Sequence, residues 1–155
     1  MTSIIRYELR SLDSLPWPHG LGKSEYRRLE RRLVALLGSG CLTPAVHKRA
    51  FETNIDYKNV VLEELGARAW SRDVIDVAAG AATLAGAAPL LGVDLIDDEQ
   101  WWAWVREQPI ADPFVRGWLI SPPDITGGYL DARHRITYLR FMCGPAFSVL
   151  VRYQR

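Results

Sequence analysis

The sequence has 155 residues, of which 48% are hydrophobic and 24% are charged, and its formal net charge is +1. These values are those of an ordinary globular protein with one domain, and a chain of this length folds without needing disulfides or a metal. A net charge this close to zero excludes a general attraction to nucleic acid or membranes, so any binding of anions must depend on a local patch.

The sequence predicts a cytoplasmic protein that makes no contact with a membrane. The N-terminus, MTSIIRYELRSLDS, lacks the apolar core of a signal peptide. Val77–Val93 is uncharged, but it is short, rich in Ala and Gly and contains Pro89, which favours a closely packed core helix over a membrane span. Cys41 and Cys143 lie in apolar surroundings, and we interpret them as reduced, buried thiols.

The first part of the chain predicts one strand followed by helices. Ile4–Leu9 is rich in aromatic and β-branched residues, which is typical of a strand. After the Pro- and Gly-rich loop Ser14–Gly22, apolar residues recur at helical spacing over Ser24–Leu37. A Thr-Pro pair then begins a second helical region, residues 43–65, with a break near Asn54.

Two more helices are predicted in the middle of the chain. Ser71 is expected to cap a helix that ends near Pro89, and Asp97 or Asp98 to cap the next one, DEQWWAWVREQ. Trp101, Trp102 and Trp104 cannot share one face of that helix, so at least one of them is expected near the surface or in a cleft.

The remainder of the chain predicts a strand–strand–helix–strand unit. WLIS (118–121) and Tyr129-Leu130 are expected to be short strands, Ala132–Cys143 a helix, and Phe147–Tyr153 a closing strand. The predicted fold is therefore α+β and a single domain, 1–155. Its helical part, about 23–108, packs on a small mixed sheet near the C-terminus.

Basic residues crowd the first turn of the last predicted helix. Arg133, His134 and Arg135 stand there, although the unpaired amides already make a helix N-terminus positive. Gly128 and an expected N-cap, Asp131, precede them, and together these groups suit an anion such as phosphate. Alternatively, Asp131 neutralises part of the charge and the arginines point into solvent, at a cost of only about a few tenths of a kcal/mol.

The segment GGYLDARHRITYLRFMCGPAFSVLVRY resembles the core of the ParB/sulfiredoxin-like superfamily. Asp131, His134 and Arg135 match an Asp-Gly-x-His-Arg or related Gly-x-x-Arg box. Leu139 matches the apolar position of the helix that follows, and Gly144 with FSVLVR matches the glycine and the closing strand. GWLISPP would be the strand before the box, so that the resemblance covers about 117–153. It implies that His134 and Arg135 contact the phosphates of a nucleotide and that Asp131 holds the turn.

The chain departs from that superfamily in three ways. Ala132 replaces the usual glycine, which restricts the approach of the backbone to a phosphate. Arg133 stands where the sulfiredoxins carry their reactive cysteine, which argues against sulfiredoxin chemistry. No residues follow Arg155 that would form a helix-turn-helix domain, so a role in chromosome segregation does not follow.

Other signals are weaker. Arg27, Arg28, Arg31 and Arg32 form a helical stripe that either contacts nucleic acid or is a solvated face interrupted by glutamates, and His47-Lys48-Arg49 would extend it. No metal site is predicted, because His19, His47 and His134 have no second ligand at a recognised spacing. The Asp97–Glu99 run is interpreted as a charge cluster at a helix N-terminus.

Two functions from different classes follow from the sequence. The first is a protein that binds a nucleotide or a nucleic-acid phosphate through Gly128, Asp131, Arg133, His134 and Arg135, with a nucleoside triphosphate and Mg²⁺ as candidate cofactors. If it is an enzyme, phosphotransfer, nucleotide hydrolysis and phosphodiester cleavage stay open, with His134 as acid or base and Arg135 stabilising charge. The second is a non-catalytic interaction module, such as an immunity or antitoxin-type partner.

Overall fold

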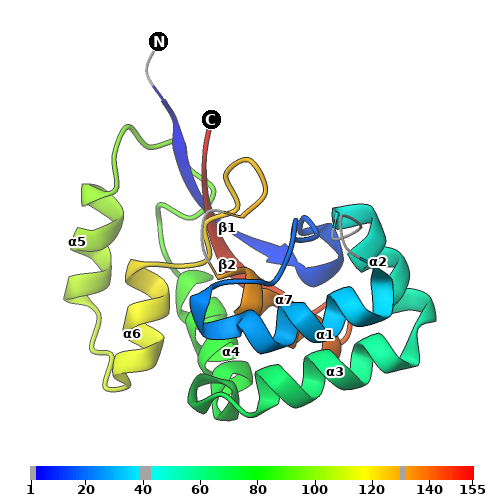
Figure 1. Ribbon diagram of the computed structural model, residues 1–155. Helices are drawn as coiled ribbons and strands as arrows, with labels where there is room; N and C mark the ends of the chain where they lie inside the picture. The colour runs from blue at the N-terminus through cyan, green and yellow to red at the C-terminus, as the bar shows by residue number, and fades with distance from the viewer. Residues whose placement is uncertain (1–2, 39–42, 130–131) are drawn as a thin grey trace.

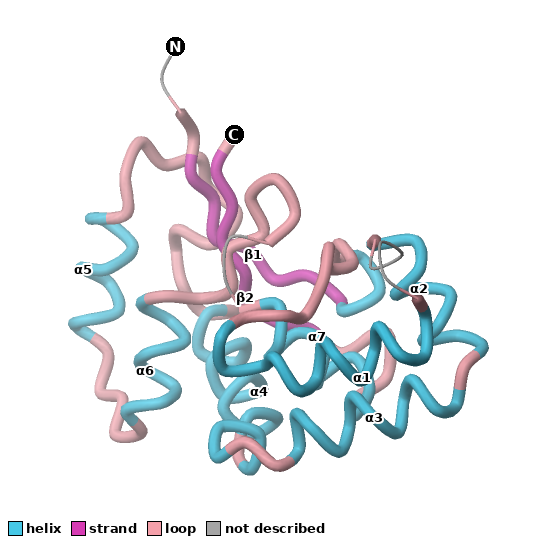
Figure 2. The backbone as a smooth tube through the Cα atoms, viewed as in Figure 1, coloured by secondary structure: helices cyan, strands magenta, loops and turns pink. Residues whose placement is uncertain are grey.

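A computed structural model describes residues 3–38, 43–129 and 132–155 (Figure 1). Seven α-helices and two β-strands are found in this part of the chain. The two strands run side by side, with helices to either side of them and below, as the tube drawing in Figure 2 shows. The α+β fold class predicted from the sequence is therefore confirmed.

The sheet joins the two ends of the chain. β1 (Ile5–Ser11) pairs antiparallel with β2 (Ser148–Gln154), in a register that places Ile5 opposite Gln154. Val149, Leu150 and Val151 are all buried, so β2 is covered on both faces. This explains why the closing strand reads as a continuous apolar run rather than as an alternating one.

The helices α1 (Arg27–Leu37), α2 (Pro44–Thr53) and α3 (Ile55–Gly66) form one group and bury their own apolar cluster. Thr43 and Asn54 cap α2 and α3, because their side-chain oxygens accept hydrogen bonds from the backbone amides of Val46 and Tyr57. The start at the Thr-Pro pair and the break near Asn54 are thus confirmed.

The helices α4 (Val74–Ala85), α5 (Glu99–Glu107), α6 (Pro113–Ile120) and α7 (Arg133–Met142) complete the fold. The Ala- and Gly-rich α4 contacts both α6 and β2, and its buried side chains include Ala78, Ala81 and Ala85. These small residues allow the close approach of neighbours that the sequence predicted. Within the ranges described above, no helix has the length and apolar character needed to cross a membrane.

The structure corrects two predicted elements of the C-terminal unit. WLIS is not a strand but the end of α6, whose N-cap Asp112 accepts hydrogen bonds from the amides of Phe114 and Val115. Tyr129 is not in a strand either, and Leu130 lies outside the described residues. The predicted strand–strand–helix–strand unit is therefore a helix, a loop, α7 and β2.

One predicted helix start is also displaced. Ser71 lies in a short 3-10 helix, Ala69–Arg72, and α4 begins only at Val74. The Ser71 hydroxyl donates backwards to the carbonyl of Arg68 and does not cap the helix. The Arg68–Asp73 connection between α3 and α4 is thereby fixed, and it forms part of the site described next.

Candidate ligand-binding site

A cavity of about 660 Å³ opens where α4, α6 and the first turn of α7 meet the segment before α1. Its volume lies within the range typical of small-molecule sites. Four aromatic rings and two arginines contribute to its lining. We call it the arginine–aromatic cavity; the residues used below are Glu25, Tyr26, Arg68, Trp70, Asp73, Phe114, Trp118 and Arg135.

Each of the two arginines lies against an aromatic ring. The guanidinium carbon of Arg68 is 4.2 Å from the ring centre of Tyr26, and that of Arg135 is 4.9 Å from the ring centre of Trp118. Arg68 also donates a hydrogen bond to the backbone carbonyl of Glu25. Both distances lie within the range of cation–π contacts, in which the ring attracts the guanidinium.

Trp70 fixes the position of the Tyr26 ring. Its indole Nε1 donates to the Tyr26 hydroxyl at 3.0 Å, and its ring packs edge-on against Tyr138 of α7. The rings of Tyr26 and His134 stack at 3.7 Å with an angle of 11° between them. One face of Tyr26 is thus occupied by His134, while Arg68 lies over the ring as well.

His134 is a structural residue rather than an exposed one. It is 5% exposed, and its Nε2 donates to the carbonyl of Leu21 at 2.6 Å. Burial lowers the pKa of His134 to about 4, although the hydrogen bond to Leu21 acts in the opposite direction. The imidazole is therefore neutral near pH 7, and its position behind Tyr26 argues against the predicted role as acid or base.

Arg133 serves the same loop. Its Nη2 donates to the carbonyl of Gly22 at 2.7 Å. Together with His134 it ties the segment before α1 to the start of α7, and this tie determines where Tyr26 stands. The crowding of basic residues on the first turn of α7 is thereby explained in part: two of the three bind backbone carbonyls and only Arg135 lines the cavity.

The turn before α7 differs from the prediction. The N-cap of α7 is Ala132, one residue after the predicted Asp131, and Asp131 itself lies outside the described residues. Ala132 adopts the left-handed conformation, with φ of 65°, which glycine tolerates best. Gly128 has φ of 111°, and its amide donates to the carbonyl of Ile125, so this amide is engaged in a turn.

The sequence did not point to Arg68, Trp70 or Tyr26 as site residues. Arg68 and Trp70 lie between two helices, and Tyr26 fits the apolar spacing of the helix that follows it. Their proximity to Arg135 depends on contacts between residues far apart in the chain. The only local signal is the pairing of a basic with an aromatic residue in Arg68-Ala-Trp70.

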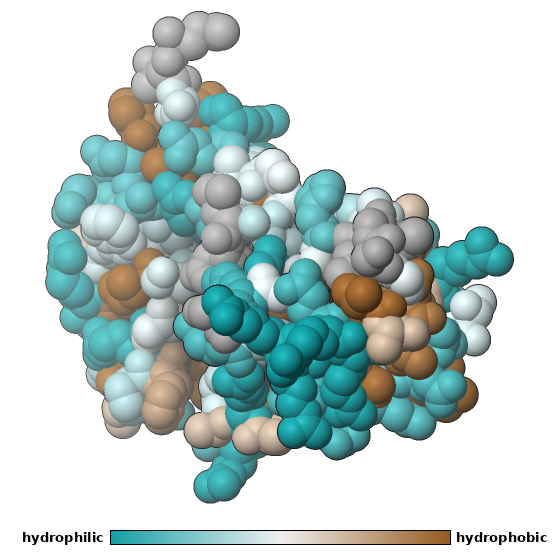
Figure 3. Space-filling view, in the orientation of Figure 1, coloured by the Kyte–Doolittle hydropathy of each residue, from teal (hydrophilic) through white to brown (hydrophobic). Residues whose placement is uncertain are grey.

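The basic stripe on α1 is partly neutralised. Arg28 and Arg32 pair with Glu64 at 2.8 Å, and Arg32 also pairs with Glu63. Arg27 and Arg31 are exposed, and a strongly hydrophilic surface covers α1 in Figure 3. His47 cannot extend the stripe, because it is buried and its Nδ1 lies 2.8 Å from the Tyr57 hydroxyl.

The other candidate groups are engaged within the fold. Asp97 accepts a hydrogen bond from the amide of Glu99, as expected for a charge cluster at a helix start, and Asp98 pairs with Arg152. Cys143 is a free thiol, half-buried rather than fully buried, and Cys41 lies outside the described residues. No group of three or more His, Cys, Asp or Glu side chains that could hold a metal ion occurs in the described ranges.

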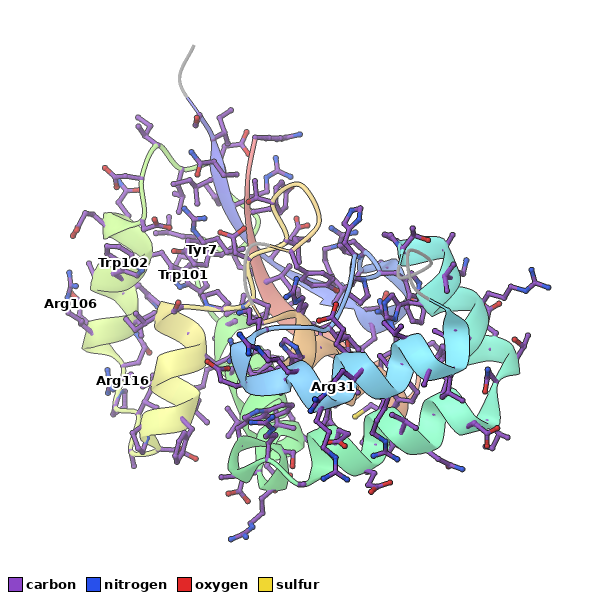
Figure 4. The ribbon with its side chains drawn as sticks, in the orientation of Figure 1. Tyr7, Arg31, Trp101, Trp102, Arg106 and Arg116 are labelled. Carbon is purple, nitrogen blue, oxygen red and sulfur yellow. The ribbon has the colours of Figure 1, made fainter. Side chains whose placement is uncertain are left out.

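The tryptophans of α5 differ in how deeply they are buried. Trp101 is buried, stacks on Tyr7 at 4.3 Å and donates to the carbonyl of Leu119. Tyr7 and Trp101 lie next to each other in Figure 4. Trp102 is half-buried, donates to the carbonyl of Ile120 and lines a smaller cavity of about 290 Å³. The prediction that at least one of these tryptophans lies near the surface or in a cleft is thus confirmed. Neither lies in the arginine–aromatic cavity.

Comparison with known proteins gives no match: no family model, no curated protein and no solved structure matches this chain.

Proposed function

We propose that this protein binds a nucleotide in the arginine–aromatic cavity, with the phosphate on Arg135 and the base near Arg68 and Trp70. The observation that carries the proposal is a pair of arginines that line one cavity, each with its guanidinium over an aromatic ring. Guanidinium forks match phosphate geometry, and both guanidinium planes and aromatic rings stack on bases.

Two further features support a base-bearing ligand over inorganic phosphate. The cavity of about 660 Å³ is far larger than a single phosphate requires. Glu25 and Asp73 also line it, and carboxylates accept hydrogen bonds from the amino groups of bases. A ligand that carries both an anionic and an amino-bearing part fits this mixed lining.

The resemblance to the ParB/sulfiredoxin-like superfamily supports Arg135 as the phosphate contact, but two details weigh against a wider likeness. The segment expected as the strand before the box is α6, and His134 stacks behind Tyr26. The proposal therefore assigns His134 and Arg133 to holding the loop before α1. It concerns binding and names no reaction.

The proposal is tested by calorimetric titration with ATP, CTP and GTP, each with and without Mg²⁺. We expect saturable binding of at least one of them and a weakening of tenfold or more, about 1.4 kcal/mol, for Arg135→Met and for Arg68→Met. Arg106→Met is the matched control, because Arg106 is an exposed arginine on α5, away from the cavity (Figure 4).

Thermal shift provides a second readout on the same samples. A ligand at about 100 times its dissociation constant stabilises the folded state by about 2.7 kcal/mol. Retention of the far-ultraviolet circular dichroism signal shows that each variant is folded. The proposal fails if no nucleotide stabilises the wild type, or if Arg106→Met weakens binding as much as Arg135→Met does.

A second candidate function, a non-catalytic interaction module, is favoured by one observation. Phe114, at the rim of the cavity, is 69% exposed, although large apolar side chains are usually covered. A protein partner that inserts a side chain into the cavity would cover it. Nucleotide-insensitive co-purification of one partner with the wild type, lost in Phe114→Ser, is the result that this alternative predicts.

A further inference from the structure

The solvent-facing side of α1 carries two arginines to which the function proposed above gives no role. Leu29 and Leu33 turn the other side of the helix to the core. Arg27 and Arg31 are four residues apart, so they lie on the same side of the helix, and both are exposed. Within the described ranges, neither of them donates a hydrogen bond or forms an ion pair. We call them the outer arginines.

The carboxylates around α1 are directed away from the outer arginines. The glutamates of α3 pair with Arg28 and Arg32, which follow a neighbouring side of the helix. The carboxylate of Glu30 lies so close to Gly22 that a Cβ at this glycine would overlap it. Glu25 precedes the helix and lines the arginine–aromatic cavity. The guanidiniums of the outer arginines are therefore accessible cations without a counter-charge in the described ranges.

The outer arginines begin next to the arginine–aromatic cavity. Tyr26, whose ring lines that cavity, directly precedes Arg27. Arg31 lies one turn further on, about 6 Å along the helix axis, and Figure 4 shows it on α1 at the front of the molecule. Neither outer arginine lines the cavity itself. A nucleotide held within the cavity leaves both cations unused, whereas a chain that continues from the cavity along α1 passes both.

A further aromatic ring lies where α6 borders the cavity. Phe114 lines the cavity there and is 69% exposed, so its ring is open to a ligand that extends beyond the cavity. Proteins that bind single-stranded nucleic acid combine aromatic rings, on which bases stack, with cations that follow the backbone. Phe114 and the cavity supply the rings, and the outer arginines supply the cations.

We propose that the nucleotide bound in the arginine–aromatic cavity belongs to a single-stranded nucleic acid, whose backbone phosphates continue along the outer arginines of α1. This inference rests on the function proposed above. A duplex does not fit, because a paired base must first leave its stack before it can enter a cavity. The net charge of +1 provides no general attraction to nucleic acid, so the contact depends on this local row of cations.

The test is fluorescence anisotropy with a labelled single strand of about ten nucleotides and mixed sequence, made once as DNA and once as RNA. We expect at least one of the two to bind at least about tenfold more tightly than the best-bound nucleoside triphosphate at the same salt concentration. The matching duplex should bind at least about tenfold more weakly than that single strand. A difference between the two single strands identifies the preferred sugar.

The variant Arg27→Gln/Arg31→Gln locates the backbone contact. It should weaken binding of the single strand at least about tenfold and leave the binding of the free nucleotide unchanged. The slope of log K against log salt should fall by about 1.4, because each lost phosphate contact removes about 0.7. Arg106→Gln/Arg155→Gln is the matched control, since it removes two exposed arginines outside α1, and it should change the affinity less than about twofold.

The outcomes separate this inference from the proposed function. If neither free nucleotides nor single strands bind, both fail together. If a free nucleotide binds, but Arg27→Gln/Arg31→Gln binds the single strand with wild-type affinity and salt slope, this inference alone is wrong. Equal binding of duplex and single strand, or single-strand binding that Arg135→Met does not weaken, would also overturn it.

Discussion

At the scale of single residues, buried polar groups organise this protein. His134 and Arg133 hold the loop before α1 through carbonyls, and Arg140 holds the loop after β1 in the same way. His47 is buried between helices against the Tyr57 hydroxyl. Two of the basic side chains that suggested an anion site in the sequence, Arg133 and His134, thus fasten a loop to the start of α7.

The two buried histidines make stability depend on pH. Burial lowers the pKa of both His47 and His134 from 6.5 to about 4. Because the folded pKa lies below the unfolded one, the unfolded chain binds more protons between these values. The contribution of the two neutral histidines to the free energy of unfolding is therefore fully present above about pH 6.5, and it is lost as the pH falls toward 4.

When the pH is lowered from 7 to 5, we expect the free energy of unfolding to fall by roughly 2 kcal/mol for each of the two histidines. Urea denaturation at the two pH values measures the loss. His134→Gln retains a side-chain N–H for the Leu21 carbonyl but does not titrate, so its loss over the same interval should be smaller by roughly 2 kcal/mol. An equal loss in wild type and variant would show that His134 does not contribute.

At the scale of elements, the caps that begin the helices are the clearest link between sequence and structure. The side chain of Asn54 accepts from the amide of Tyr57 at 3.0 Å and separates α2 from α3. We expect Asn54→Ala to lower the free energy of unfolding by about 1 kcal/mol. Asn59→Ala, at an exposed position within α3, is the matched control and should change it by less than about 0.5 kcal/mol.

The measurement is chemical denaturation of both variants beside the wild type. A loss in Asn59→Ala as large as that in Asn54→Ala would mean that the cap is not the cause.

The sequence predicts those elements that carry local signals. Helices α1, α2, α3, α5 and α7 and both strands follow from apolar spacing, caps and β-branched runs. The error at α6 has a physical reason: its end, WLIS, is apolar and resembles a strand, yet Asp112-Pro113 is the same kind of start signal as Thr43-Pro44. The cap outweighs the apparent β-preference of four residues.

The site was less predictable for a different reason. Arg135 was identified because its charge conflicts with the helix dipole, and that conflict is visible in the sequence. Its neighbours in the cavity, Arg68 and Tyr26, come from segments far away in the chain and carry no such conflict. The role of His134 depends on the carbonyl of Leu21, a contact that no spacing rule reveals.

At the scale of the whole molecule, one ion-pair network joins β2 to distant segments. Arg152 donates to both carboxylate oxygens of Asp98 and to Asp124, and Tyr7 of β1 donates to Asp98. Arg152 lowers the pKa of Asp98, despite the opposing effect of burial. The network thereby connects the sheet, the start of α5 and the loop after α6.

We expect Arg152→Met to lower the free energy of unfolding by about 3 kcal/mol, because it leaves the carboxylate of Asp98 largely buried without its counter-ion. The double variant Arg152→Met/Asp98→Asn should lose less free energy of unfolding than the two single variants lose together. The reason is that Asp98→Asn removes the carboxylate charge that Arg152→Met leaves unpaired. Denaturation of the four proteins gives this coupling energy. Strict additivity would show that the pair does not act as a unit.

The central claim is that the arginine–aromatic cavity binds a nucleotide through Arg135, and its most direct test is an NMR titration with ATP read on the indole N–H signals. Those of Trp70 and Trp118, whose indoles line the cavity, are predicted to shift saturably, while that of Trp101, buried against Tyr7, stays unchanged. The shifts should vanish in Arg135→Met and persist in Arg106→Met. Unchanged Trp70 and Trp118 signals at saturating ATP would contradict the account.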